Sequence, residues 1–174
     1  MQLAITALSS TSKNFLTDLL SATSNCECNI VEFRTSQLSK AAACYLLAEG
    51  EWNQIAKLET FLKNLNHHPD ILIQTSRPAK NNQECDGIPY MLETLSLYRP
   101  DILHDLTRFL LSRNIHIDEV NALRYQSSYS QNMTYSIRMA IIIPAEVRIL
   151  SLREELLEFC DHINLDAIFE PIKR

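Results

Sequence analysis

The sequence predicts an α+β fold made of two tandem βαββαβ units. Strand-like and helix-like hydrophobic patterns follow one another in the order β-α-β-β-α-β, and the whole series occurs twice. A polar segment that contains a proline separates the two series. The chain has 174 residues, of which 46% are apolar, and this is enough for two small units that each have a core.

The first unit is expected to span residues 1–76. Its strands are predicted at Leu3–Leu8, Asn29–Leu38, Ala41–Glu49 and Ile71–Gln74, and its helices at Asn14–Asn25 and Trp52–Leu65. Residues 77–88 are expected to form a linker, because Arg77–Glu84 is polar and has no hydrophobic periodicity.

The second unit is expected to span residues 89–174. Its strands are predicted at Tyr90–Leu97, Ile115–Arg124, Met133–Ile143 and Leu165–Glu170, and its helices at Pro100–Arg113 and Ala145–His162. Proline is common in the first turn of a helix, and Asp101 in that turn would complement the helix dipole.

The two halves of the sequence are also related by an internal repeat. A shift of 87 residues places Leu16, Asp18, Leu19, Ile30 and Glu32 on Leu103, Asp105, Leu106, Ile117 and Glu119. Later in the unit the best shift is 94 residues, so the extra residues are assigned to a longer loop at Tyr125–Asn132. A repeated βαββαβ order predicts ferredoxin-like units, each an antiparallel sheet with its helices on one face.

Composition and charge exclude several classes of function. The net charge is −5 and no basic run is present, which argues against direct nucleic-acid binding. With only two glycines, the chain cannot build a P-loop or a dinucleotide fingerprint. There is no signal peptide and no apolar run of the ~20 residues that would span a bilayer, and the five cysteines are irregularly spaced. We therefore expect a cytoplasmic protein with reduced thiols and no membrane association.

Several blocks of the sequence resemble a known family. They are Cys28–Glu32 with Arg34, Gly50–Glu59, Arg99-Pro100 followed by Ile102, and Leu165–Ile168 with Glu170-Pro171. Through them nearly the whole chain resembles tandem ACT-domain proteins, and more closely the glycine cleavage system transcriptional repressors. The resemblance implies two ACT units without a cofactor. It also implies repression of glycine cleavage genes by contact with a DNA-binding transcriptional activator.

The resemblance places a candidate ligand site at the loop after the first strand of each unit. The residues concerned are Ser9, Asn14, Asn29 and Ile30 in the first unit, and Tyr98, Arg99, Pro100 and Asp101 in the second. In the amino-acid-binding members, glycines in this loop let a carboxylate approach a helix N-terminus. Both loops here lack those glycines, Tyr98 stands where an acidic residue is expected, and Asp101 would repel a carboxylate. The sequence thus predicts degenerate sites and argues against an amino-acid ligand.

No catalytic residue and no metal site are predicted. His67-His68-Pro69-Asp70 is interpreted as a helix end followed by a turn, because adjacent side chains diverge and no third ligand lies nearby. The other candidates have unsuitable spacing or no partner in the sequence: Cys26 and Cys28, Cys160 and His162, and His104 and His116.

Two groups of residues are candidates for protein contact. Glu154, Glu155 and Glu158, with Asp161, form an acidic cluster that is either a solvated face or a surface for a basic partner. Tyr125, Tyr129 and Tyr135 lie in or beside the long loop and either pack locally or form a contact patch.

The sequence as a whole predicts a non-enzymatic regulatory protein, specifically a negative regulator of glycine cleavage system genes that binds a DNA-binding activator. The alternatives left open are an amino-acid-binding sensor, a regulatory subunit of an amino-acid metabolic enzyme, and a free-standing enzyme. Edge strands left open by two such sheets would permit a homodimer.

Overall fold

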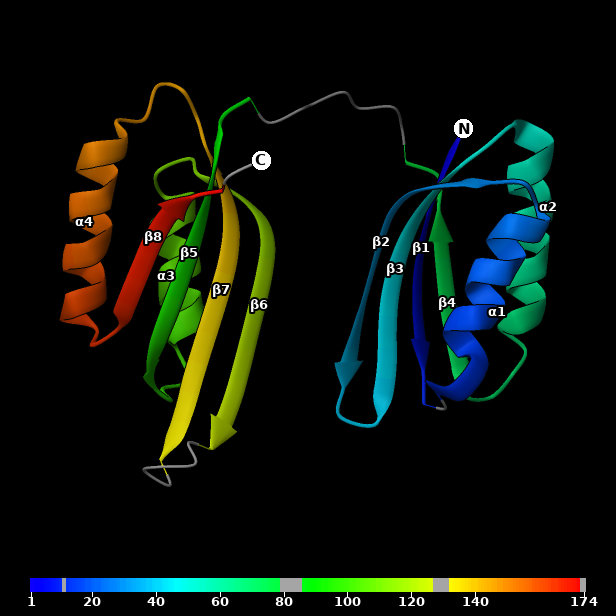
Figure 1. Cartoon of the computed structure of the whole chain (residues 1–174), viewed down its shortest axis with the longest axis horizontal. Coiled ribbons are helices and arrows are strands. Elements are labelled where there is room, and N and C mark those ends of the chain that lie inside the picture. The colour runs from blue at the N-terminus through cyan, green and yellow to red at the C-terminus, as the bar shows by residue number, and fades with distance from the viewer. Residues whose placement is uncertain (11, 79–85, 127–131, 173–174) are drawn as a thin grey trace. The chain divides into compact units, whose positions relative to one another are not determined.

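The chain folds into two compact units, Met1–Asn82 and Gln83–Arg174. The computed structural model describes residues 1–10, 12–78, 86–126 and 132–172. In each unit, two helices cover one face of a four-stranded antiparallel sheet, and the opposite face carries no helix (Figure 1). The predicted fold class of two βαββαβ units is confirmed.

The first unit contains β1 (Gln2–Ser9), α1 (Ser12–Asn25), β2 (Asn29–Leu38), β3 (Ala41–Glu49), α2 (Trp52–Leu65) and β4 (Ile71–Ser76). Its strand order is β2-β3-β1-β4. Burial alternates along β1, where Leu3 and Ile5 are buried. They share one core with Leu58 and Leu62 of α2, so strand and helix periodicity both point inward.

The second unit contains β5 (Ile88–Leu97), α3 (Ile102–Leu111), β6 (His116–Gln126), β7 (Met133–Ile143), α4 (Ile149–His162) and β8 (Asp166–Pro171). Its strand order, β6-β7-β5-β8, matches that of the first unit. Leu92 of β5, Leu106 and Leu110 of α3 and Leu156 of α4 are fully buried in its core.

The repeat extends to details of the backbone. Glu27 and Asn114, 87 residues apart, follow the first helix of their units, and both have φ of 56°. Each is followed by the same hydrogen bond back to the helix, from Cys28 N–H to the carbonyl of Thr23 and from Ile115 N–H to that of Leu110. The strand register shifts at Ile30/Glu32 and again at Ile117/Glu119.

The longer second loop is also confirmed by the strand bounds. β6 ends at Gln126 and β7 begins at Met133, whereas only Ser39 and Lys40 separate β2 from β3. The chain therefore lengthens at the hairpin between the two middle strands of the second unit.

Three predicted helix starts are wrong, and the first of them is that of α1, which begins at Ser12 and not at Asn14. The helix expected from Pro100 begins at Ile102, because Pro100 and Asp101 form a turn. The helix expected from Ala145 begins at Ile149, because Val147 N–H donates to the carbonyl of Pro144 and closes a turn there. These turns contain proline and apolar residues that fit the sequence pattern of a helix, so these two predicted helices began too early.

The expected unit boundaries of 1–76 and 89–174 remain predictions, since residues 79–85 lie outside the described part. Arg77, at the start of the expected linker, is bound to Glu59 of α2, and β5 already begins at Ile88. In the described residues, no helix is long and apolar enough to cross a membrane.

Candidate ligand loops and partner surfaces

The first candidate loop is tied to the turn between α2 and β4. Ser9 is buried at the end of β1. The next residue, Ser10, donates its hydroxyl to Asp70 Oδ1 at 3.0 Å and its backbone N–H to the Asp70 carbonyl at 3.1 Å. Asp70, the last residue of the predicted His67–Asp70 turn, thus fixes the position of this loop.

A hollow of about 610 Å³ lies beside this loop. It is lined by Asn14, Phe15 and Asp18 of α1 and by Asn64, Leu65, His67, His68, Pro69 and Ile71. His68 Nδ1 lies 4.0 Å from Asp70 Oδ2 and accepts the Asp70 N–H at 3.4 Å. Within the described residues, no group of three or more His, Cys, Asp or Glu side chains is placed to hold a metal ion.

Asn29 and Ile30 lie at the other end of the same sheet. Asn29 pairs with Glu49 of β3, whereas Ser9 pairs with Ala42 of the same strand. These two β3 positions are seven residue steps apart, which corresponds to ~23 Å along the strand. The first unit therefore does not bring its candidate ligand residues together.

The second candidate loop is occupied by the Tyr98 side chain. The Tyr98 N–H donates to the Met133 carbonyl at 2.9 Å, which fixes the loop to the start of β7. The Tyr98 ring meets Tyr135 edge to face, with centroids 5.5 Å apart, and the Arg124 guanidinium lies 4.8 Å from the Tyr98 centroid. Arg124 stands opposite Tyr135 in the β6–β7 ladder, so the hairpin register places both beside Tyr98.

The basic side chains of Arg99, Arg108 and His104 contact the Asp105 carboxylate rather than an open ligand site. Arg99 Nη2 donates to Asp105 Oδ2 at 2.9 Å, and Arg108 and His104 lie 3.9 and 3.8 Å from Oδ1 of the same carboxylate. Pro100 and Asp101 are exposed, and Asp101 makes no side-chain capping bond to α3.

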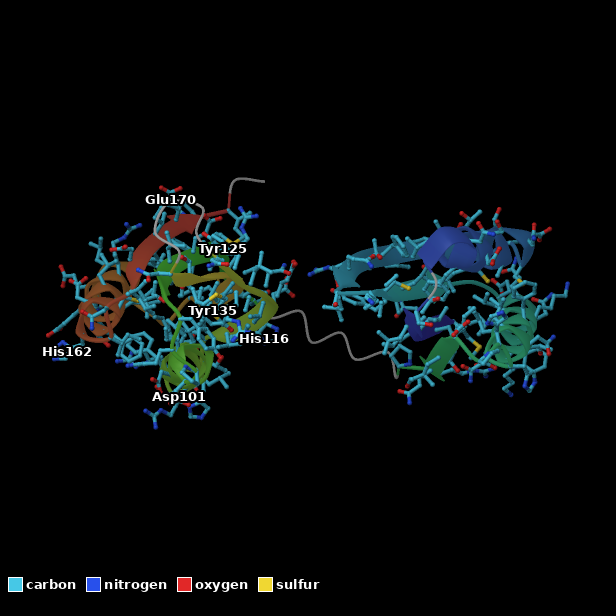
Figure 2. The ribbon with its side chains drawn as sticks, turned by 90° about the horizontal axis from the view of Figure 1, so that it is seen from below. Asp101, His116, Tyr125, Tyr135, His162 and Glu170 are labelled. Atoms are coloured by element: carbon cyan, nitrogen blue, oxygen red, sulfur yellow. The ribbon has the colours of Figure 1, made fainter. Side chains whose placement is uncertain are left out.

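The predicted tyrosines do not form one patch. Tyr125 and Asp101 lie on opposite sides of the second sheet (Figure 2), whereas Tyr135 packs against the core on the helix side. Tyr129 lies outside the described residues. Of the two interpretations, local packing holds for Tyr135, and Tyr125 is left as a single exposed aromatic residue.

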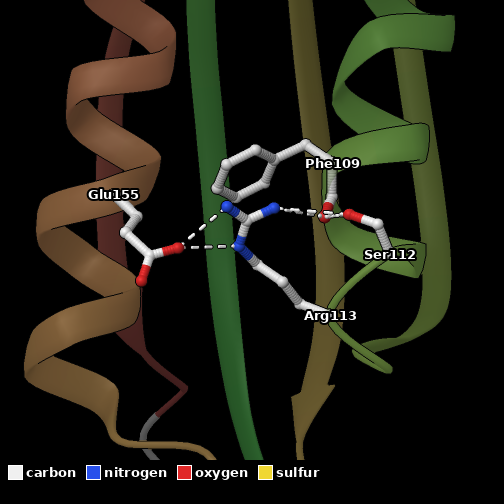
Figure 3. A network of polar contacts seen from close by, with 4 residues as sticks. All are labelled: Phe109, Ser112, Arg113 and Glu155. Atoms are coloured by element: carbon white, nitrogen blue, oxygen red, sulfur yellow. Dashed lines mark hydrogen bonds and ion pairs between the residues drawn. The ribbon is translucent and has the colours of Figure 1, made fainter.

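The acidic cluster of α4 divides into two kinds of residue. Glu155 accepts two hydrogen bonds from Arg113, at 2.9 Å from Nε and 2.8 Å from Nη2 (Figure 3). Glu154 and Glu158 are exposed and form no ion pair with a described residue. Unlike Glu155, these two carboxylates project freely from the helix.

The cysteines of the described regions are mostly buried. Cys28, Cys44 and Cys160 are buried, and Cys26 is half-buried. Burial raises the pKa of the Cys28 and Cys44 thiols, and burial together with Asp161 raises the pKa of Cys160 to about 11. These thiols are therefore poor nucleophiles at neutral pH. Cys85 lies outside the described residues.

Comparison with known proteins gives a likeness of fold over the whole chain. No protein-family model and no curated protein sequence matches. A crystal structure described as a "putative glycine cleavage system transcriptional repressor" is 18% identical, with a TM-score of 0.74 and coverage of 99% of this chain and 98% of that one. An unknown protein from Galdieria sulphuraria is 17% identical, with the same TM-score and coverage. The chain thus resembles these proteins in its complete two-unit fold.

A second kind of likeness covers only part of the chain. A formyltetrahydrofolate deformylase from Pseudomonas putida matches 47% of this chain and 28% of its own, with 15% identity and a TM-score of 0.40. This likeness is too low to inform the function of the chain.

Proposed function

We propose that this chain is a non-enzymatic regulatory protein that lowers the expression of glycine cleavage system genes by binding their DNA-binding activator. The observation that carries the proposal is the full-length likeness of fold to the structure described as a repressor of this system. That likeness includes both units and their order, so it concerns the whole architecture and not a single domain.

The chemistry of the described residues supports a role without catalysis. The buried thiols of Cys28, Cys44 and Cys160 have raised pKa values and are neutral at pH 7, and His104 and His68 each lie beside a carboxylate, that of Asp105 and that of Asp70. The net charge of −5 disfavours direct contact with the DNA backbone. The neutral thiols and the acidic net charge are compatible with a protein that acts by binding another protein.

The proposal is tested with the full chain, the purified activator and a fluorescent promoter fragment of the glycine cleavage genes. We expect the chain alone to leave the anisotropy of the DNA unchanged. Added to the activator–DNA complex, it should change the anisotropy in a dose-dependent way. An unrelated DNA-binding protein on its own operator serves as the control. Binding of the chain to DNA alone, or no effect at saturating concentration, would contradict the proposal.

A further inference from the structure

A further hollow lies in the second unit where α4 ends and β8 begins, and it is here called the α4–β8 hollow. It has a volume of about 470 Å³. Its lining on the helix side of the sheet consists of Thr94, Leu157, Cys160, Asp161, Leu165 and Ala167. The last pair between β5 and β8 is Leu95 with Asp166, so the sheet ends here and the hollow also contacts residues of the helix-free face.

The α4–β8 hollow contains a buried hydroxyl group without a partner. Thr94 is only 4% exposed, and its Oγ1 forms no hydrogen bond with a described residue. Its side chain points toward the helices, because burial alternates along β5 and Tyr90 and Leu92 on the same face are buried. A buried hydroxyl that makes no hydrogen bond destabilises a fold, and in a native protein it calls for an explanation.

The fold itself does not require this hydroxyl, because the first unit has none at the same position. The shift of 87 residues that relates the two units places Thr94 on Ala7. Ala7 pairs with Ile73 of β4, and Thr94 pairs with Ala167 of β8. The second unit thus combines a core hydroxyl with a small neighbour where the first unit has a bulky apolar side chain. The smaller side chain of Ala167 leaves space beside Thr94.

The charge around the α4–β8 hollow is negative. Asp161 lines it from the last turn of α4, and Asp166 lines it from the start of β8. Neither carboxylate forms an ion pair with a described residue, whereas the lining residue Glu93 is bound by Arg138. The described lining includes no Lys, Arg or His, and His162 points away from the sheet (Figure 2). The C-terminal end of a helix also favours a positive charge.

These features define the kind of molecule that fits the hollow. The buried hydroxyl requires a neutral hydrogen-bonding group, and the Asp161 carboxylate attracts a cation. Leu157 and Leu165 provide apolar walls between them. Because no group of three or more metal-binding side chains is present in the described residues, the fitting cation is organic. A free amino acid does not fit, since its carboxylate would be repelled by Asp161 and Asp166.

We propose that the α4–β8 hollow binds a short amino alcohol. The ammonium group of the ligand lies beside Asp161, and its methylene groups contact Leu157 and Leu165. Its hydroxyl forms a hydrogen bond with Thr94 Oγ1, which can both donate and accept. The described lining contains none of the residues of the Tyr98 loop. The site does not depend on the regulatory role proposed above, so either can hold without the other.

The first test uses the unchanged full chain and three ligands with the same carbon chain. We expect 3-aminopropan-1-ol to shift amide signals in heteronuclear NMR spectra in a saturable way, at Thr94 and from Asp161 to Ala167. Propylamine lacks the hydroxyl and should bind about tenfold more weakly. β-Alanine has a carboxylate instead and should not bind. The proposal is overturned if 3-aminopropan-1-ol shows no saturation, or if propylamine or β-alanine binds equally well.

A pair of variants then identifies the hydroxyl that the ligand contacts. Thr94→Val keeps the shape of the side chain and should weaken the binding of 3-aminopropan-1-ol about tenfold. Without ligand, the same variant should unfold at a higher temperature than the unchanged chain, because the unpartnered hydroxyl is gone. Ser96→Ala is the matched control, since Ser96 Oγ on the same face of β5 is also buried without a described partner but does not line the hollow.

A second pair of variants tests the charge. Asp161→Asn should weaken binding about fivefold. Glu154→Gln removes an exposed carboxylate of the same helix that does not line the hollow, and it should leave the affinity unchanged. The proposal is overturned if Thr94→Val or Asp161→Asn binds 3-aminopropan-1-ol as tightly as the unchanged chain. It is equally overturned if either control variant loses as much affinity as its counterpart.

Discussion

Arg113 joins the end of α3 to α4 by binding Glu155, while its guanidinium lies 3.7 Å from the centroid of the Phe109 ring. Arg113 Nη1 also donates to the Phe109 carbonyl at 3.2 Å (Figure 3). The side chain thus provides a hydrogen bond to a carbonyl group in the last turn of α3. Phe109 in turn stacks on Phe159 of α4 with centroids 4.6 Å apart. The two helices are thus held by one aromatic and one ionic contact side by side.

We expect Arg113→Ala to lower the free energy of unfolding by about 1–2 kcal/mol, because it removes both the cation–π contact and the ion pair. Glu155→Ala should cost at most about 1 kcal/mol, since the pair is partly exposed. Urea denaturation of both single variants and of the double variant gives the coupling energy between them. Glu154→Ala is the control, and an equal effect from it would contradict a specific role for Glu155.

The Arg113–Glu155 contact also marks what the sequence could not predict. The interpretation of Glu154, Glu155 and Glu158 as one cluster followed from their spacing on a helix. Arg113 lies 42 residues away and reaches only one of the three, which depends on how α3 and α4 pack. Element order, by contrast, is set by local periodicity, and the bounds of α2 and β7 agree with the prediction to the residue.

Glu59 and Arg77 predict a dependence of stability on pH. The Arg77 guanidinium donates to both carboxylate oxygens of Glu59 at 2.7 Å, and this hydrogen bonding holds the pKa of Glu59 below its usual range. A carboxylate with a lowered pKa in the folded state stabilises the fold above its unfolded pKa of ~4.3, and the effect is lost as the pH falls through the folded value.

Glu59→Gln should therefore be less stable than the unchanged chain at pH 7, and the difference should shrink as the pH falls below ~4. Urea midpoints measured across this range give the result. Glu158→Gln, which removes an exposed and unpaired carboxylate, is the control. A difference that stays constant with pH would rule out the ion pair as its cause.

Glu27 and Asn114 allow a test of backbone strain at equivalent positions. Both have φ of 56°, a left-handed conformation that glycine adopts without cost and that asparagine tolerates better than glutamate. We expect Glu27→Gly to raise the free energy of unfolding by about 1 kcal/mol, and Asn114→Gly to raise it by less. Thermal unfolding of both variants measures this. Glu27→Ala is the control, and an equal gain from alanine would contradict relief of strain.

Cys160 should be the least reactive of the four described thiols in the folded protein. Its side chain is buried in the core of the second unit, and a pKa of about 11 leaves roughly one thiol in a thousand ionised at pH 8. Among the four described cysteines, we expect iodoacetamide at pH 8 to label half-buried Cys26 first and Cys160 only after unfolding in urea. Peptide mass spectrometry over time measures the order. Rapid labelling of Cys160 in the native protein would show that its core opens readily.

The Tyr98 loop leads to a prediction about ligands. The Tyr98 ring is held by Arg124 and Tyr135, and Asp101 stands exposed at the start of α3. We therefore expect no thermal shift with any of the twenty amino acids, although a ligand at 100 times its dissociation constant would add about 2.7 kcal/mol. Tyr98→Asp combined with Asp101→Gly should open this loop and raise the affinity for amino acids.

Two controls separate the causes of any shift. Asp101→Gly alone removes the repulsion of a carboxylate but leaves Tyr98 in place. If only the double variant gains affinity for amino acids, the Tyr98 ring is the cause of the lost binding. A thermal shift of the unchanged chain would contradict the prediction that the Tyr98 loop is closed to ligands. The hollow lined by Asn14, Asp18 and His68 in the first unit would then be the alternative binding site. Asp18→Asn should then abolish that shift, because its carboxylate is the lining group able to bind an amino group.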